Sequence, residues 1–379
     1  MKDFNQKVVC NDGIHTPLIR EKMIDIKIPD DITSKKCYTY GKIIKLEHNG
    51  ENNGILIATN ENSETKNWAL YRSYDDGDSW EEFSSIPDSI NTDCFPGYQP
   101  YMIELPTDMG DYKKGTILYS GCSYSGTKTN IVLFASRDLG VSWEGVCNIG
   151  MGGGYNQGGW TSQGVWEPFM YFDDESGKLY CYYSDEQNPE HNQRLICKYS
   201  TDVVNWSEEI DVLTLKELRP GMIAFTKMGN GKYAMVYEMV NFDPHAQVHI
   251  KFSDSLESWE PTERGKPVLN AQGGGLAGAP AIAWTPDGGE CGTLMITAVY
   301  DWKTDTATQC ALFVSYDYGE TFMSVENPIP AMPNSSVRSG YSSGFFVDKD
   351  GYVYYVNDPE YDKGAVCEKL VFAKLSAKK

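Results

Sequence analysis

Two glutamates stand in apolar or aromatic stretches of the sequence, where a carboxyl group is costly to bury unless it is paired or functional. Glu167 lies in the run WEPFM, and Glu238 lies in the run YAMVYEMV. Because desolvation raises the pKa of a carboxyl group, either position suits a general acid. The alternative for each is a buried Glu that Arg or backbone donors satisfy, and the residues alone leave the two interpretations equally open.

A glycine-rich segment at residues 152–160 precedes Glu167 in the chain. It does not have the form G-x-G-x-x-G at the start of a helix, so it does not indicate a nucleotide site. The simpler interpretation is a flexible loop that lines a cleft.

A repeated phrase reveals the elements that must position these residues. The pattern S-x-D-x-G-x-x-W occupies residues 73–80 and 136–143, and residues 315–322 repeat it with a final Phe. Two degenerate copies, which match the pattern only in part, begin at Ser200 and Ser253. Each copy follows a strand-like run, and its Asp and Gly suit a tight turn with a buried Trp beneath it. The phrase resembles the Asp-box of sialidase-like β-propellers, and we interpret it as a structural hairpin turn rather than a catalytic motif.

The spacing of the copies predicts the architecture. Their first Ser residues lie at positions 73, 136, 200, 253 and 315, which is 53 to 64 residues from one copy to the next. Such a step accommodates four short strands with their turns, which is one propeller blade. We therefore predict an all-β, six-bladed β-propeller in a single domain, residues 1–379, with five blades as the alternative. The N-terminal run 22–28 is expected to join the last blade, beside residues 370–373, and to close the ring.

Composition limits the partners. The net charge of −20 disfavours nucleic acid and anionic membrane surfaces, and mildly disfavours acidic sugars, whereas a neutral glycan is compatible. Some of the 25 Tyr and 9 Trp residues are expected to stack on sugar faces, although most will pack the blades. No apolar stretch is long enough to span a bilayer. The first five residues contain no signal-peptide core, so we expect a cytoplasmic protein or one whose leader has been removed. We expect a monomer.

The ten Cys residues include no C-x-x-C pair, so no zinc or redox motif is predicted. So many unpaired thiols fit a reducing habitat better than an oxidising one. The acidic runs 75–78 and 173–175 do not match a calcium-binding loop, and we interpret them as solvated turns. No metal or cofactor is expected.

Several segments together resemble glycoside hydrolase family 93. The most discriminating are WEPF at residues 166–169 and the stretch 182–195, which begins YYSDEQNP. The resemblance extends over roughly residues 35 to 360. Further matching segments are residues 99–106, 115–118, 200–206, 219–222 and 231–238.

The resemblance implies a six-bladed propeller that acts as an exo-α-1,5-L-arabinanase, releasing arabinobiose from linear arabinan with retention of configuration. It implies that Glu167 is the general acid/base and Glu238 the nucleophile. It also implies that Tyr341, in the segment SGYSSG, lies beside the nucleophile and tunes it. Such a mechanism requires two carboxyl groups about 5–5.5 Å apart. Arabinan or an arabino-oligosaccharide is then the expected substrate.

The same segments supply secondary candidates for substrate binding. The alternative is a structural salt bridge for Arg219 and Arg338, and loop packing for the others. His191, Asn192 and Arg194 are candidates for hydrogen bonds to furanose hydroxyls. The aromatic candidates for stacking are Trp160, Tyr155 and Tyr98, and the cationic candidates are Arg219 and Arg338.

Three rival functions stay open at the level of sequence. A sialidase needs three convergent Arg residues; this chain has only seven Arg, and the spacing around Glu238 and Tyr341 does not match that family. A non-catalytic propeller that binds glycan or protein is a second rival, because fold alone does not prove activity. An exo-enzyme acting on another furanoside or on galactan is the third.

Overall fold

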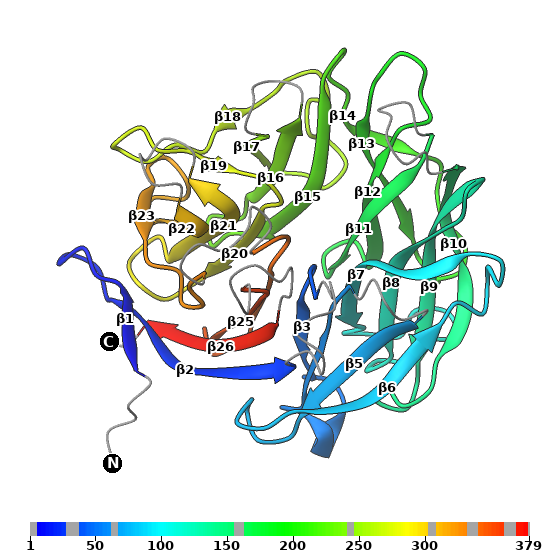
Figure 1. Cartoon of the computed structure of the whole chain (residues 1–379), viewed down its shortest axis with the longest axis horizontal. Helices are drawn as coiled ribbons and strands as arrows, with labels where there is room; N and C mark the ends of the chain where they lie inside the picture. The colour runs from blue at the N-terminus through cyan, green and yellow to red at the C-terminus, as the bar shows by residue number, and fades with distance from the viewer. Residues whose placement is uncertain are drawn as a thin grey trace, which may run out of the picture. The chain divides into compact units, whose positions relative to one another are not determined.

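The regular structure of the chain is almost entirely β (Figure 1). The structure, a computed structural model, describes residues 6–27, 38–61, 67–154, 163–240, 246–301, 308–331, 340–359 and 369–377. Within these ranges there is no α-helix, and the single 3₁₀ turn is η1 (Gly50–Asn52). The frequent Gly, Pro and Asp residues between short apolar runs explain this pattern, because they favour turns and leave no uninterrupted helical stretch.

One compact unit comprises residues 44–223 and 260–263, and three four-stranded antiparallel sheets belong to it almost completely. In each sheet the strands follow one another in chain order, as in a meander. The first sheet contains β3 (Lys42–Lys45), β4 (Leu56–Thr59), β5 (Asn67–Ser73) and β6 (Glu81–Pro87). The second contains β7 (Phe95–Glu104), β8 (Ile117–Tyr124), β9 (Lys128–Ser136) and β10 (Glu144–Gly153). The third contains β11 (Val165–Asp173), β12 (Lys178–Asp185), β13 (Arg194–Ser200) and β14 (Ile210–Leu213).

The other compact unit comprises residues 1–43, 224–259 and 264–379. Two of its blades are linked into one nine-stranded sheet, because the short β19 (Leu276–Ala277) pairs with a strand of each. The fourth blade contains β15 (Arg219–Lys227), β16 (Tyr233–Val240), β17 (Gln247–Ser253) and β18 (Lys266–Pro267). The fifth contains β20 (Ala281–Thr285), β21 (Thr293–Asp301), β22 (Thr308–Ser315) and β23 (Met323–Val325).

The last sheet combines strands from the two ends of the sequence. Its order is β1 (Lys7–Cys10), β2 (Leu18–Lys27), β26 (Leu370–Ala377), β25 (Val353–Asn357) and β24 (Gly344–Val347). The antiparallel pairing of β2 with β26 places the N-terminal run in the last blade, as the sequence predicted. The prediction of an all-β six-bladed β-propeller is confirmed, and the five-bladed alternative is wrong. That the whole chain is a single domain stays a prediction.

Apolar side chains on facing strands hold neighbouring sheets together within each unit. One core packs the second sheet against the third, and another packs the fifth blade against the last sheet. Each fully buried Leu, Ile, Val or Phe side chain contributes about 1.5–3 kcal/mol relative to an exposed one. Members of the first core include Leu118, Leu133, Met170 and Ile196, and members of the second include Met295, Leu312, Tyr355 and Val371.

The repeated phrase forms the hairpin turns that join the outer strands. In the first copy Asp75 accepts hydrogen bonds from Ser73 Oγ at 2.8 Å and from the Ser79 N–H at 2.9 Å. The Trp80 indole N–H donates to the carbonyl of Gly77 at 3.2 Å, which fixes the ring under the turn. Hydrogen bonds from Ser79 lower the pKa of Asp75 to about 2, because they favour the ionised form. All oxygens of this carboxylate therefore serve the turn, which agrees with a structural role.

Candidate active site

Glu167 lies in a β-bulge near the start of β11. The pairing register between β11 and β12 shifts between Trp166 and Phe169, so Glu167 and Pro168 face no partner on β12. The φ angle of Glu167 is 66°, in the left-handed region, which a non-glycine residue before proline rarely adopts. Bulges re-aim side chains next to active sites. Here the bulge takes Glu167 out of the strand ladder, and its side chain is partly exposed.

The carboxylate of Glu167 is bound through one oxygen. Oε2 accepts a hydrogen bond from Ser184 Oγ at 2.8 Å and another from the Met222 N–H at 2.7 Å. Among the described residues, none donates to Oε1. Since a backbone N–H can only donate, the proton of a protonated Glu167 belongs on Oε1, the oxygen to which no described residue donates.

The surroundings of Glu167 favour its protonated form. Burial raises the pKa of this carboxyl group, and the nearby carboxylate of Glu186 adds to the rise. The Met222 N–H, the positive charge of Arg219 and the Ser184 hydroxyl act in the opposite direction but do not cancel the effect of burial. A carboxyl group with a raised pKa keeps its proton to a higher pH, as a general acid must.

Arg219 forms an ion pair close to Glu167. Its Nη2 lies 2.6 Å from Oε1 of Glu186, whose side chain is almost fully buried. The other carboxylate oxygen of Glu186 accepts a hydrogen bond from the Trp166 indole at 3.0 Å. Of the two roles that the sequence left open for Arg219, the structure shows the ion pair, and contact with substrate stays a prediction.

Glu238 lies in β16 and is buried, with 7% of its surface exposed. Its Oε2 accepts a hydrogen bond from the Ala279 N–H at 2.8 Å. Ala279 has a φ angle of 41° and precedes Pro280, so a strained backbone delivers this donor. A hydrogen bond from a backbone N–H stabilises the ionised form of a carboxyl group, which a nucleophile requires.

Tyr341 lies in the turn before β24. Its ring packs edge-on against Tyr40 with a centroid distance of 5.4 Å, and its carbonyl accepts the Tyr40 N–H at 3.1 Å. Glu167 belongs to one compact unit, whereas Glu238 and Tyr341 belong to the other. The separation of the two carboxylates, and the closeness of Tyr341 to Glu238, stay predictions.

The three polar candidates between β12 and β13 have different surroundings. Arg194 is held by three carboxylates, those of Asp185, Glu209 and Asp211, at 2.6 to 2.8 Å. The sequence gave loop packing as the alternative to sugar binding for Arg194 and did not predict this network; contact with substrate stays a prediction. The exposed Asn192 donates to the carbonyl of Glu217 at 2.9 Å.

His191 follows a different pattern from its neighbours. Its Nδ1 is buried and has no hydrogen-bond partner among the described residues. An unsatisfied buried ring nitrogen is costly, which keeps His191 a candidate for contact with a ligand. Tyr155, Trp160 and Arg338 lie outside the described residues.

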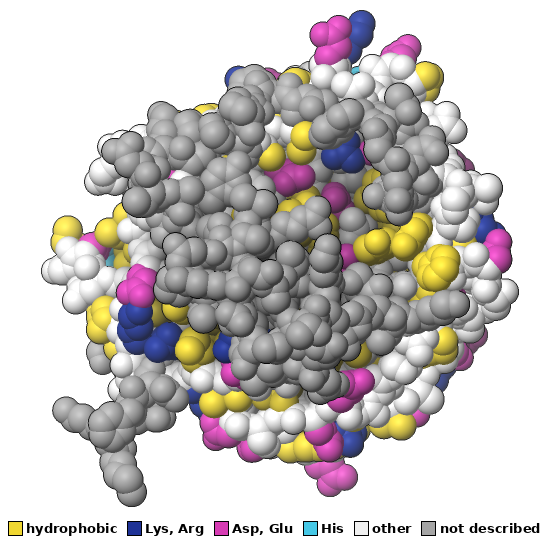
Figure 2. Space-filling view, viewed as in Figure 1, with side chains coloured by type: hydrophobic (Ala, Val, Ile, Leu, Met, Phe, Trp, Pro, Cys, Tyr) yellow, Lys and Arg dark blue, Asp and Glu magenta, His cyan; other side chains and the backbone are white. Residues whose placement is uncertain are grey.

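Tyr98 belongs to a group of three rings at the start of β7. The ring centroids of Tyr98 and Tyr124 are 4.7 Å apart, and those of Tyr124 and Phe95 are 5.9 Å apart. About half of the Phe95 surface is exposed, at 49%. Figure 2 shows hydrophobic side chains gathered over the region where Figure 1 draws β7 to β10. Tyr98 therefore lies among other aromatic rings. That a sugar stacks on it stays a prediction.

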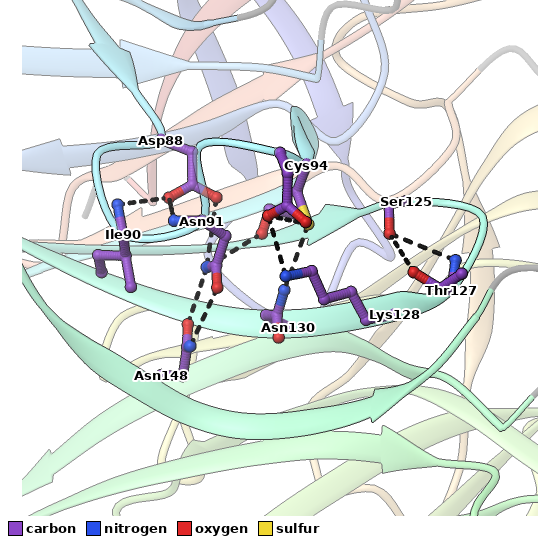
Figure 3. A network of polar contacts seen from close by, with 11 residues as sticks. Asp88, Ile90, Asn91, Cys94, Ser125, Thr127, Lys128, Asn130 and Asn148 are labelled. Atoms are coloured by element: carbon purple, nitrogen blue, oxygen red, sulfur yellow. Dashed lines mark hydrogen bonds and ion pairs between the residues drawn. The ribbon is translucent and has the colours of Figure 1, made fainter.

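A polar network anchors the loop that leads into β7 (Figure 3). Asp88 accepts the N–H groups of Ile90 and Asn91 at 2.9 and 2.8 Å. The Asn91 and Asn148 amides exchange two hydrogen bonds of 3.0 and 3.1 Å, which tie the loop to β10. The start of β7 is therefore fixed on its own sheet before the chain reaches Tyr98.

The sequence did not single out the residues that hold Glu167. Ser184 and Met222 bind its carboxylate, and Gln99 Oε1 accepts its N–H at 2.9 Å. A usable signal was present, because Gln99 and Glu167 each precede a proline within a strand-like run. Among the described residues, no group of three or more His, Cys, Asp or Glu is placed to hold a metal ion. The described part of the chain also contains no helix long and apolar enough to cross a membrane.

Comparison with known proteins adds to this geometry. No protein-family model matches the chain, and no curated protein matches it. The α-L-arabinanase of Penicillium chrysogenum, solved with arabinobiose, is 28% identical over 94% of this chain and 98% of that chain, with a TM-score of 0.79. The family 93 α-L-arabinofuranosidase of Fusarium graminearum, also solved with arabinobiose, is 24% identical over 98% of both chains, with a TM-score of 0.79.

A sialidase also shares the fold, but less closely. The NanB sialidase of Streptococcus pneumoniae is 9% identical over 92% of this chain and 70% of that chain, with a TM-score of 0.56. This likeness concerns the fold alone. The higher scores and near-complete coverage of the two arabinan-related structures confirm the resemblance to family 93 that the sequence motifs indicated.

Proposed function

We propose that this chain, which has the fold of glycoside hydrolase family 93, releases arabinobiose from the ends of linear α-1,5-L-arabinan with retention of configuration. The main support is the setting of Glu167. Its pKa is raised by burial, one of its oxygens is held by two donors, and the other accepts no hydrogen bond from the described residues. The solved relatives are named as an arabinanase and an arabinofuranosidase, which supports arabinan as the substrate.

In the first step, Glu238 attacks the anomeric carbon while Glu167 donates its proton to the glycosidic oxygen. The bond between C1 and that oxygen breaks, the shortened arabinan leaves as an alcohol, and an ester forms between C1 and the Glu238 carboxylate. Glu238 attacks as the carboxylate, whose Oε2 accepts the Ala279 N–H, and Glu167 provides the proton from Oε1.

In the second step, Glu167 is ionised and removes a proton from water. The water oxygen attacks C1, the ester bond to Glu238 breaks, and arabinobiose leaves with its original configuration. The Ser184 hydroxyl and Met222 N–H stabilise the Glu167 carboxylate during this half of the cycle. Tyr341, if it lies beside Glu238 as the family resemblance implies, adjusts the charge on the nucleophile.

Product analysis on debranched arabinan tests the proposal. We expect arabinobiose to be the sole product from the first seconds, and the proton NMR spectrum of the nascent product to show retention. A ladder of oligosaccharides would show endo cleavage, and the inverted anomer would exclude the double displacement. Release of sialic acid from a sialoside, with no action on arabinan, would favour the sialidase instead.

The pH dependence of kcat/KM should respond to Ser184. Its hydroxyl favours the ionised form of Glu167 and so lowers the pKa of that carboxyl group. We expect Ser184→Ala to raise this pKa and to move the basic limb of the profile to higher pH, since that limb reports loss of the proton from Glu167. Ser176→Ala, an exposed serine in the turn after β11, is the control and should leave the limb in place. A shift to lower pH would contradict the assignment of Glu167 as the acid.

A further inference from the structure

We propose that Gln99 is a positioning residue for Glu167, and that the buried Glu61 in turn holds Gln99. All three residues belong to one compact unit: Gln99 lies in β7, Glu167 lies in β11, and Glu61 lies just beyond the end of β4. The proposal rests on the proposed function, because it takes Glu167 to be the acid/base of the reaction.

The first link joins Gln99 to the backbone of Glu167. Because Glu167 lies in a bulge, its N–H has no acceptor on β12, and Gln99 Oε1 accepts it at 2.9 Å. An unsatisfied N–H and a left-handed φ angle would each favour relaxation of the bulge. The Gln99 side chain satisfies the N–H in the strained conformation, and thereby stabilises the conformation that presents the carboxyl group.

The second link joins Gln99 to Glu61. The register between β7 and β8 shifts between Tyr98 and Tyr101, so Gln99 lies in a bulge of its own, and its φ angle is 52°. Its N–H donates to Oε2 of Glu61 at 3.1 Å, and the Glu61 side chain is buried with 8% exposed. The residue that holds Glu167 is therefore itself strained and itself held.

Glu61 occupies a position in the first blade that is equivalent to the position of Glu238 in the fourth blade. In both blades the second strand begins with a residue that pairs with the first Ser of a repeat copy. Glu61 and Glu238 each lie five residues beyond that starting residue. The starting pairs are Leu56 with Ser73 and Tyr233 with Ser253.

The two glutamates also make the same kind of contact. Glu61 accepts the N–H of Gln99, and Glu238 accepts the N–H of Ala279. Each donor is a left-handed, non-glycine residue followed by proline. In one case the glutamate is the predicted nucleophile, Glu238. In the other the glutamate, Glu61, binds Gln99, whose side chain binds the backbone of the predicted acid, Glu167.

The surroundings of Gln99 make it a rigid support. Tyr101 of β7 packs on Phe169 of β11 with a ring centroid distance of 4.7 Å, which holds the two strands side by side. The loop before β7 is tied to its sheet by the network around Asn91 and Asn148 (Figure 3). A support on a fixed strand can keep a carboxyl group within a fraction of an ångström of its working position.

The test compares two substrates in the Gln99→Met variant, which keeps the length of the side chain but removes the acceptor. Arabinotriose needs protonation of its leaving group, whereas a 2,4-dinitrophenyl arabinobioside does not. We expect kcat/KM for arabinotriose to fall about tenfold or more, the size of effect that small misplacement of a catalytic group produces. The value for the aryl glycoside should change little, since its first step does not use the acid.

Two further variants separate positioning from general loosening of the fold. Gln99→Glu keeps an acceptor oxygen, so it should restore most of the activity while its charge moves the basic limb of the pH profile upward. Thr59→Val removes a buried hydrogen bond from the Thr59 hydroxyl in β4 to the Ala69 carbonyl in β5. It does not alter the hydrogen bonds of Gln99. It should lower Tm without changing the ratio of kcat/KM values for the two substrates.

The second link has its own pair of variants. Glu61→Gln retains an acceptor for the Gln99 N–H and should keep most activity on arabinotriose, whereas Glu61→Met should act as Gln99→Met does. Equal losses on both substrates, or unchanged arabinotriose activity in Gln99→Met, would overturn the positioning role. A wild-type chain inactive on both substrates would instead refute the proposed function.

Discussion

Replacement of Glu238 by Gly is expected to abolish arabinan hydrolysis, and added azide is expected to restore turnover with an inverted product. The variant lacks the carboxylate that forms the ester with C1, so the first step loses its nucleophile. Azide enters the vacated space and attacks C1 directly, and a single displacement gives arabinobiosyl azide of inverted configuration. The measurement is the rate on an activated aryl arabinobioside with and without azide, with the product anomer assigned by NMR.

The milder variant Glu238→Gln separates chemistry from folding. A Gln side chain keeps an oxygen that can accept the Ala279 N–H, so we expect a near-unchanged Tm. Loss of a nucleophilic group nevertheless costs orders of magnitude, about 10³-fold or more in kcat by comparison with other covalent mechanisms. Glu290→Gln, at an exposed position in the same compact unit, is the matched control and should retain full activity. Wild-type turnover in Glu238→Gln would remove Glu238 from the mechanism.

Replacement of Glu167 by Gln is expected to lower kcat on arabinan by about 10²–10⁴-fold, the usual contribution of general acid–base catalysis. An amide cannot protonate the departing oxygen, although its carbonyl can still accept the Ser184 hydroxyl and Met222 N–H. The loss should shrink as the leaving group improves, because a 2,4-dinitrophenolate departs without a proton. A plot of log kcat/KM against leaving-group pKa should therefore be much steeper for the variant than for the wild type.

Two comparisons give this prediction its controls. Glu175→Gln changes an exposed carboxylate in the turn after β11 and should leave the plot unchanged. With Glu167→Gly, azide should restore turnover through the second step and give a product of retained configuration, the opposite of the outcome at Glu238. Inverted product from the Glu167 variant would mean that the two glutamates have exchanged roles.

The architecture was readable from the sequence because it depends on local, repeated chemistry. In each full copy of the phrase, the Asp carboxylate binds backbone groups only a few residues away, as at Asp138, which accepts the Ser142 N–H at 2.9 Å. Regular spacing of such turns defines the blades. In the copy that starts at Ser253, the Ser hydroxyl donates to the carbonyls of Ser255 and Ser258, so this copy forms its turn with other partners.

The supports of the candidate site were not readable in this way. Glu167 and Glu238 stood out because a carboxyl group is unusual in an apolar run, but their partners come from other strands. Met222 lies 55 residues from Glu167, and Gln99 lies 68 residues from it. Only the bulges and the registers of the sheets bring these groups together. Arg194 shows the reverse case, since a side chain predicted to meet sugar is occupied by three carboxylates.

The pairing of β2 with β26 has a consequence for biosynthesis. The sheets from β7 to β14 are built from strands contiguous in the sequence, so each can form as its segment leaves the ribosome. The last sheet cannot, because all the strands from β3 to β25 lie between β2 and its partner β26 in the sequence. Throughout that interval the edge of β2 that faces away from β1 presents unpaired backbone groups to its surroundings, and such an edge can pair with other chains. The last sheet therefore forms only after β26 has been synthesised, whatever the speed at which the other sheets fold.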